Sequence, residues 1–355
     1  MKGSELKETL SSYKKLFGSI EPHQLDHFLK NHLPAHHEAK KRLAMGWADW
    51  EALKKYSQVA QYYGDHAFYS MAVANFCRIE NPYPVKTAEF IGSGTGKYTL
   101  DSYRKIQIED GRVLFEKVYK NDTDDLKKIK FFMRCVFPQL NGRLKIPSAE
   151  FHEGEKGTIL LFDWVDKIVA VDRGEVLDFY IDFREAALDV AVPSGMESSV
   201  ECDFTREPMF QSGVSSSKRW LELNVSSEVS KQIPFFVDYF KNMPPDELVF
   251  THGDIFPANA AKGGIVIDFD RCGFYPASYE LAHVSSKSFH FESLDSMLSV
   301  LNKEINKFSF SSQMAFYFFA FIFYSRRIGV KSSDAFLLEL WEAFSLRAKG
   351  EGIGL

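Results

Sequence analysis

Residues 248–259 read Leu-Val-Phe-Thr-His-Gly-Asp-Ile-Phe-Pro-Ala-Asn, and residues 265–270 read Ile-Val-Ile-Asp-Phe-Asp. In each segment an apolar run of strand length leads to an acidic residue, first Asp254 and then Asp268. Asn259 follows Asp254 by five positions, and Lys262-Gly263-Gly264 then supplies the residues of a tight turn. The pattern predicts a hairpin that brings two carboxylates and one amide together at one end.

This set of side chains suits phosphoryl transfer. The reaction needs a carboxylate to orient the attacking hydroxyl, and it needs oxygen ligands for Mg²⁺, which is a hard cation. We expect Asp254 to be the base or positioning group, and Asn259 and Asp268 to hold magnesium. The alternative interpretation is that these are ordinary turn residues at the ends of hairpins, and His-Gly-Asp alone would not exclude it.

With residues 276–282, Pro-Ala-Ser-Tyr-Glu-Leu-Ala, the region resembles the aminoglycoside phosphotransferase and choline kinase-like superfamily over about forty residues. The resemblance implies an α+β, two-lobed protein-kinase-like fold, with a small antiparallel β lobe and a larger, mainly α lobe. It also implies ATP and Mg²⁺ as cofactors. In this family the position of His252 fixes the catalytic loop, so His252 enters the catalytic set as a structural residue.

The pattern of apolar and helix-breaking residues divides the chain into three parts. Apolar residues at helical spacing predict a helical N-terminal extension over residues 1–84, which ends at the breaker Asn81-Pro82-Tyr83-Pro84. We expect a nucleotide-binding small lobe and hinge over residues 85–165, and a catalytic and acceptor-binding large lobe over residues 166–355. The elements predicted in the small lobe are strands at 87–91, 99–108, 112–119 and 157–164, with a helix at 124–137.

The glycine-rich stretch and the strands around it are assigned to nucleotide binding. Glycines between two strands let the backbone approach phosphates closely, although such a turn by itself is more often a plain hairpin. The resemblance implies that a lysine in the predicted strand at 112–119 contacts the phosphates and that a hinge carries the adenine. The residues assigned in this way are Gly92, Gly94, Gly96, Lys117, Asp163 and Val165.

One feature departs from the family pattern. Kinases of this fold present a glutamate from the following helix to the strand lysine, but residues 126–148 contain no acid, and Asp122, Asp124 and Asp125 come too early. Either an acid from elsewhere pairs with Lys117, or Lys117 is held differently. The departure motivates an alternative function, a catalytically weak pseudokinase or a nucleotide-sensing binding module.

The acceptor is expected to be a hydroxyl of a small molecule or glycan, such as a sugar, an amino alcohol or an aminoglycoside-like compound. Protein kinases hold peptides on a long segment after the metal-binding acid, but here the helix start at Tyr279 follows Asp270 almost at once. A choline-like acceptor needs an aromatic cage, for which the candidates are Trp341, Phe289 and Phe291. Aminoglycosides need acids instead, for which the candidates are Asp163, Asp166, Asp178 and Asp182.

The composition excludes several other classes. The net charge of −5 is spread over 355 residues, which disfavours a nucleic-acid partner. Four separated cysteines without a CxxC pair argue against a disulfide framework or a thiolate zinc site. The start lacks a secretory signal, and the longest apolar run, Met314 to Tyr324, is too short to span a membrane, so we expect a cytoplasmic enzyme.

Two further groups of charged or titratable residues are interpreted as structural. Arg326 and Arg327 follow the Phe-rich run and are expected to cap the C-terminal end of a core helix. A histidine group near the start favours a solvated face over a metal site, because no cysteine lies nearby and a proline interrupts the spacing. Its members are His23, His27, His32, His36 and His37.

Overall fold

The computed structural model describes most of the chain from Asn81 to Ile353. The residues inside that range that are not described are 94–101, 120–122, 141–143, 155–156, 166–171, 173, 191, 194–198, 200–201, 258 and 329–331. The predicted helices before residue 81 and the histidine group lie outside the described residues. The described residues form two units, one from 81–126 and 147–165 and the other from 127–146 and 172–353.

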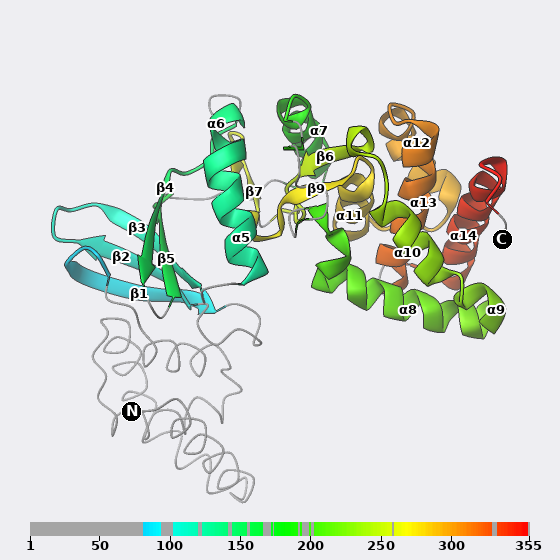
Figure 1. The fold of residues 1–355 in the computed structure, drawn as a ribbon, viewed down its shortest axis with the longest axis horizontal. Coiled ribbons are helices and arrows are strands. Elements are labelled where there is room, and N and C mark those ends of the chain that lie inside the picture. The colour runs from blue at the N-terminus through cyan, green and yellow to red at the C-terminus, as the bar shows by residue number, and fades with distance from the viewer. Residues whose placement is uncertain are drawn as a thin grey trace, which may run out of the picture. The chain divides into compact units, whose positions relative to one another are not determined.

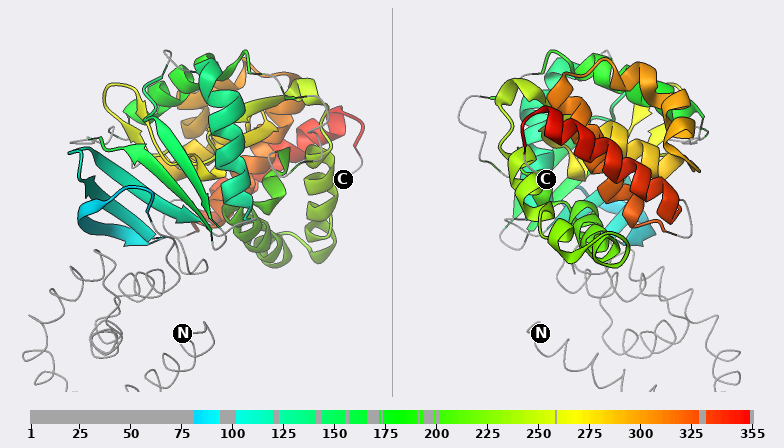
Figure 2. Two further views of the ribbon diagram at one scale, coloured as in Figure 1. Left: turned by 60° about the vertical axis from the view of Figure 1, so that its left-hand side comes forward. Right: turned by 90° about the vertical axis from the view of Figure 1, so that its right-hand side faces the viewer.

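The first unit is built on a five-stranded antiparallel sheet in the order β1-β2-β3-β5-β4 (Figures 1 and 2). The strands predicted from alternating apolar residues are present, and the sheet gains an edge strand that was not predicted. That strand, β4, carries glutamate and histidine side chains that give little apolar signal. The bounds are β1 Val85–Ser93, β2 Ser102–Ile108, β3 Val113–Tyr119, β4 Ala149–Gly154 and β5 Gly157–Asp163.

One face of this sheet carries an apolar core, with Ile106, Leu114 and Ile159 among its buried members. The alternation of the strands places Glu116 on the same face as Leu114, where Arg104 of β2 neutralises it. Arg104 Nε donates to Glu116 Oε1 at 2.5 Å, and both side chains are buried. A buried charge is tolerated here because its partner is equally buried.

The helix predicted over 124–137 is longer and irregular. It begins as α5 (Asp124–Phe131), continues through the π-helical turn η1 (Phe132–Val136) and ends as α6 (Phe137–Leu140). Pro138 is the second residue after the π turn. Because proline has no N–H and its ring crowds the carbonyl four residues earlier, a regular α-helical path is disfavoured there.

The second unit is mainly helical and is organised around α13 (Phe310–Ser325), whose residues from Met314 to Ser325 are all buried. Helices α8, α11 and α14 pack against it, and Figure 2 shows α14 (red) lying along it. The other helices are α7 Glu175–Ala187, α8 Pro208–Asn224, α9 Ser227–Ser230, α10 Ile233–Lys241, α11 Tyr279–Ser288, α12 Leu294–Ile305 and α14 Asp334–Gly350. The Phe-rich run is therefore core, as predicted.

Short strands and 3₁₀ turns complete this unit. They are η3 Phe204–Arg206, η4 Pro245–Glu247, β6 Leu248–Thr251, β7 Ala260–Ala261, β8 Ile265–Val266, η5 Phe269–Arg271 and β9 Gly273–Pro276. A small antiparallel sheet unit and a larger, mainly helical unit confirm the predicted α+β organisation. Within the described residues, every helix is too short or too polar to cross a bilayer.

Candidate active site

The loop predicted to carry the chemistry connects β6 to β7. Strand β6 pairs with β9 and delivers the chain into the loop at His252, and β7 and β8 then form a two-stranded hairpin. The turn of this hairpin contains Gly263 and Gly264, with φ of 86° and 78°, as the glycine pair predicted. The hairpin is confirmed, although β6 pairs with β9 rather than with β8.

Gly253 allows the loop to approach a neighbouring backbone. Its φ is 79°, and a Cβ at this position would lie 2.0 Å from the carbonyl oxygen of Arg271. Any other residue would clash with backbone that has little room to move. Gly253 therefore fixes the distance between the loop and η5, which carries Arg271.

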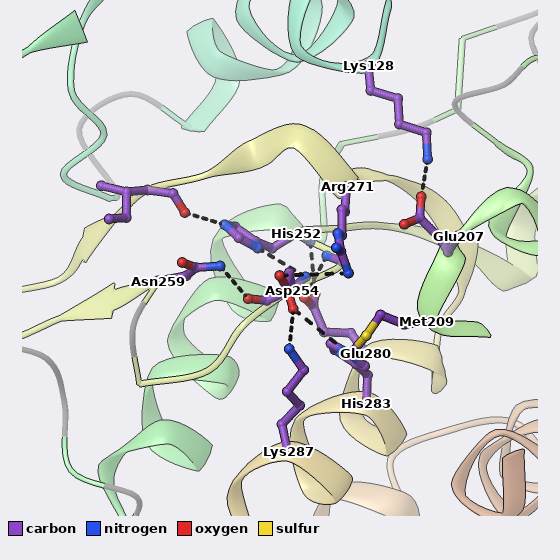
Figure 3. A network of polar contacts seen from close by, with 12 residues as sticks. Lys128, Glu207, Met209, His252, Asp254, Asn259, Arg271, Glu280, His283 and Lys287 are labelled. Carbon is purple, nitrogen blue, oxygen red and sulfur yellow. Dashed lines mark hydrogen bonds and ion pairs between the residues drawn. The ribbon is translucent and has the colours of Figure 1, made fainter. Parts of the chain in front are cut away.

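Glu280 at the start of α11 holds the same loop from the other side. Its Oε2 accepts the N–H of His252 at 3.0 Å, and its Oε1 accepts the N–H of Gly253 at 2.8 Å (Figure 3). Burial raises the pKa of Glu280 to about 8, while the two N–H groups act in the opposite direction. Sequence reasoning used Glu280 only as part of a motif and assigned it no role.

His252 ties the loop to the second strand of the hairpin. Its Nε2–H donates to the carbonyl oxygen of Ile267 at 2.8 Å, and its Nδ1 accepts the N–H of Asp254 at 3.2 Å. Burial lowers the pKa of His252, so the ring is neutral near pH 7. These two bonds fit the structural role expected for His252.

Three basic side chains surround the Asp254 carboxylate, which is largely buried. Lys287 Nζ lies 2.9 Å from Oδ1, His283 Nε2 lies 3.9 Å from Oδ1, and Arg271 lies 4.0 Å from Oδ2. Burial acts to raise the pKa of Asp254, but these neighbours outweigh it and hold the pKa below its usual 3.8. Burial also lowers the pKa of His283 to about 3, so the positive charges near Asp254 at neutral pH belong to Lys287 and Arg271.

His283 and Lys287 were missed from the sequence. They lie 29 and 33 residues after Asp254, and both point from α11 toward its carboxylate (Figure 3). The usable signal was helical spacing, since His283 and Lys287 follow Glu280 by three and seven positions and share its face of the helix. Once Glu280 faces the loop, the other two must face it as well.

Asn259 and Asp268 are the residues predicted to supply oxygen ligands to magnesium. Asn259 Nδ2 donates to the carbonyl oxygen of Asp254 at 3.0 Å, so its amide oxygen is the atom left to serve as a ligand. Asp268 is exposed and has φ of 67°, the one positive φ at a non-glycine position among the described residues. Such a conformation costs on the order of 1–3 kcal/mol and is typical of functional positions.

This donor set fits magnesium. Mg²⁺ is usually bound by one or two carboxylates, with water and substrate phosphates completing its shell. No group of three or more His, Cys, Asp or Glu side chains suited to a metal occurs within the described residues.

The residues assigned to the nucleotide lie in the sheet unit. Gly92 belongs to β1, while Gly94 and Gly96 lie outside the described residues. Lys117 on β3 is buried, with Nζ 5.4 Å from the centre of the Tyr119 ring. Asp163 ends β5 and accepts a hydrogen bond from Ser148 Oγ, and Val165 follows it.

The helix after β3 carries a buried lysine rather than a glutamate. Lys128 of α5 donates to Glu207, which precedes α8, and to the hydroxyl of Tyr275 at 2.7 Å. The acids of α5 are confined to its first turn. In place of the glutamate that the sequence lacks here, this helix contributes Lys128 to a buried ion pair with Glu207.

The sequence was compared with family models and with known proteins. Residues 212–303 match the model of the phosphotransferase enzyme family. This match confirms the predicted resemblance over α8 to α12, which includes the loop with Asp254, the β7–β8 hairpin and Lys287. The phosphotransferase match does not extend to the sheet unit or to Arg326. A comparison with curated protein sequences found no significant match.

Solved structures of several kinases are similar to the chain at low identity. An ethanolamine kinase from Plasmodium vivax is 13% identical over 90% of this chain and 95% of its own, with a TM-score of 0.43. Choline kinase LicA from Streptococcus pneumoniae is 12% identical over 77% and 88%, with a TM-score of 0.43. An aminoglycoside phosphotransferase from Streptomyces rimosus is 16% identical over 66% and 92%, with a TM-score of 0.39.

Proposed function

We propose that the protein is a magnesium-dependent kinase that transfers the γ-phosphate of ATP to a hydroxyl of a small molecule or glycan. One observation carries the proposal. A single loop and hairpin, inside the region that matches the phosphotransferase family, carry a buried carboxylate, Asp254, together with two side chains that have oxygen atoms to offer a cation, Asn259 and Asp268. We also propose that residues 85–165 bind the nucleotide and that residues 166–355 hold the acceptor.

In this proposal Asp254 orients the acceptor. The hydroxyl donates a hydrogen bond to the carboxylate, and its oxygen attacks the γ-phosphorus as the bond to the bridging oxygen of ADP breaks. The hydroxyl proton passes to Asp254 late in the reaction, because a carboxylate with a lowered pKa is a weak base. Asn259 and Asp268 hold Mg²⁺, which would neutralise the phosphate charge. Lys117 is the proposed contact to the phosphates on the nucleotide side.

The fixed position of Asp254 supports a catalytic role. His252, Gly253 and Glu280 hold the loop through hydrogen bonds and a close backbone approach, so the carboxylate needs little rearrangement to meet a hydroxyl. Such positioning is the main contribution that a protein makes to phosphoryl transfer.

The test is ADP release with ATP, Mg²⁺ and a panel of sugars, sugar acids, amino alcohols, aminoglycosides and nucleosides. Asp254→Asn keeps the size of the side chain and is expected to lower kcat by about 10²- to 10⁴-fold. Asp246→Asn, which changes an exposed carboxylate of η4, is the matched control and should leave kcat unchanged.

Two outcomes would reject the proposal. Equal turnover by Asp254→Asn and the unaltered protein would remove Asp254 from the reaction. ATP binding without turnover of any acceptor would favour the alternative, a pseudokinase or nucleotide-sensing module, which the departure around Lys117 motivates.

A further inference from the structure

The surroundings of the Asp254 carboxylate are strongly positive. Lys287 and Arg271 approach it directly, and Arg326 and Arg327 lie at the C-terminal end of α13 within electrostatic range of them. Burial and the charges of Arg327 and Arg271 lower the pKa of Arg326, so these cations disfavour one another. Two cations thus contact the carboxylate, and Arg326 and Arg327 interact electrostatically with these two.

Arg326 is held at this place rather than extended into solvent. Its guanidinium donates to Met209 Sδ at 3.0 Å through Nη1, and to Ser212 Oγ at 3.3 Å through Nε. Neither partner carries a negative charge. The role expected from the sequence, capping the end of α13, therefore does not explain why Arg326 lies near Arg271 and Lys287.

A second observation points to a ligand at the same place. His283 is 1% exposed, and neither of its ring nitrogens has a hydrogen-bond partner. Leaving a buried polar group without a hydrogen bond is unfavourable. Its Nε2 is turned toward Asp254 at 3.9 Å, which is longer than a hydrogen bond, so the carboxylate does not satisfy the His283 ring.

The cations lie on the side of Asp254 that the acceptor must reach. Asn259, a proposed magnesium ligand, binds the backbone carbonyl of Asp254, whereas the carboxylate points toward α11 and η5 (Figure 3). The acceptor hydroxyl has to contact that carboxylate. The groups of the acceptor next to this hydroxyl therefore face Lys287 and Arg271, with Arg326 and Arg327 nearby.

We infer that the acceptor is anionic: a sugar or polyol that bears a carboxylate or phosphate beside the hydroxyl that is phosphorylated. The inference rests on the proposed function and narrows its substrate class. Arginine binds carboxylate or phosphate through two parallel hydrogen bonds, and an added negative charge relieves the repulsion within the cluster. A cationic acceptor would meet like charge, which is unfavourable.

The other acceptor classes considered from the sequence fit less well. Trp341, a candidate for an aromatic cage, is buried, with its ring centre 5.2 Å from that of Phe321 and 5.3 Å from that of Phe344. Phe289 and Phe291 stack on each other at 5.6 Å. Of the acids considered for aminoglycosides, Asp166 lies outside the described residues, Asp163 lies in the sheet unit, and Asp178 and Asp182 lie on α7.

The experiment compares acceptors that differ in charge, with the full-length protein. Glucose, glucosamine, glucuronate and glucose 6-phosphate are tested for ADP release with Mg²⁺ and saturating ATP. One of the two anionic sugars should have a kcat/KM about tenfold or more above glucose and glucosamine, the worth of one charge-assisted hydrogen bond. Comparing glucuronate with glucose 6-phosphate separates a carboxylate from a phosphate.

The variant Arg326→Gln/Arg327→Gln should abolish this preference by raising KM for the anionic sugar, with KM for ATP unchanged. Arg326→Lys/Arg327→Lys should restore part of it. Lys218→Gln/Arg219→Gln, which removes two successive cations from α8, is the matched control and should retain the preference. A preference for glucose or glucosamine would overturn the inference, as would a rise in KM for ATP alone, which would assign the cations to the nucleotide.

A binding measurement separates this inference from the proposed function. Glucose 6-phosphate, glucuronate and glucose are titrated calorimetrically into the protein with a non-hydrolysable ATP analogue. Tighter binding of an anionic sugar, weakened in Arg326→Gln/Arg327→Gln, supports the anionic site even where no ADP is released, and then only the proposed function fails. Equal binding of all three sugars overturns the anionic site.

Discussion

Two buried groups of charges in the helical unit differ in how well they are balanced. Around Glu207, one lysine meets one carboxylate, and the Tyr275 hydroxyl accepts from Lys128 and donates to Glu207 at 3.0 Å. Around Asp254, one carboxylate meets Lys287 and Arg271, beside a histidine whose ring makes no hydrogen bond. The first group is satisfied within the protein, whereas the second contains a buried histidine ring whose nitrogens have no hydrogen-bond partner.

We call the Lys128–Glu207 group the closed pair and the group around Asp254 the open cluster. The comparison indicates which charges stabilise the fold and which serve binding. A closed pair stabilises one arrangement of the chain, since removing either partner leaves a buried charge uncompensated. An open cluster contributes less to folding, because its cations already repel one another. Equivalent substitutions in the two places should therefore have opposite consequences.

The largest effect on stability is expected for Lys128→Met. It leaves Glu207 as a buried charge without its cation and should lower the free energy of unfolding by about 3–5 kcal/mol, measured by urea denaturation. Lys128→Met/Glu207→Leu should recover most of that loss. If the double variant is no more stable than the single one, the Lys128–Glu207 ion pair does not account for the stability of this region.

Lys287→Met makes the same chemical change at the open cluster. Burial and Arg271 already lower the pKa of Lys287, so losing its charge should change the free energy of unfolding by less than about 1 kcal/mol. It should lower kcat by about 10²-fold, since Asp254 loses its closest partner beside the transferred phosphate. A stability loss equal to that of Lys128→Met would remove the distinction between the two groups.

The smallest effect is a pH dependence that only the open cluster should show. The pKa of Asp254 lies below 3.8 and that of His283 is about 3, so neither group titrates between pH 5 and 8. Burial lowers the pKa of Lys287 below 10.5, against the opposing effect of Asp254. Glu280, with a pKa of about 8, titrates at the upper end of that range. At saturating substrates kcat should therefore be flat from about pH 5 to 7 and fall at higher pH, where Lys287 loses its proton below pH 10.5.

The free energy of unfolding should rise with pH over the same alkaline range in which kcat falls. Between the pKa of folded Lys287 and 10.5 the unfolded chain binds the extra proton, so this group makes unfolding more costly as pH rises. Lys287→Arg keeps the cation and should remove the alkaline fall in kcat. An identical pH profile for Lys287→Arg and the unaltered protein would assign the fall to another group.

The sequence predicted most of what is local in this structure. The strand–loop–hairpin around Asp254, strands β2 and β3 and the buried run of α13 all have strong periodicity or turn glycines. The edge strand β4 and the π turn were missed because polar edge positions and a single proline give weak signals. Lys287 was missed because its contact with Asp254 depends on where α11 packs, which no local pattern encodes.

Glu280 and Lys287 sit seven residues apart on α11, so the helix that clamps the catalytic loop also sets the charge beside it. A substitution that moves α11 would disturb both at once. Arg326 and Arg327 belong to the end of a different helix and hold no part of the loop. An engineer who wants a new acceptor should therefore start at the end of α13, where charge can be exchanged while the loop stays in place.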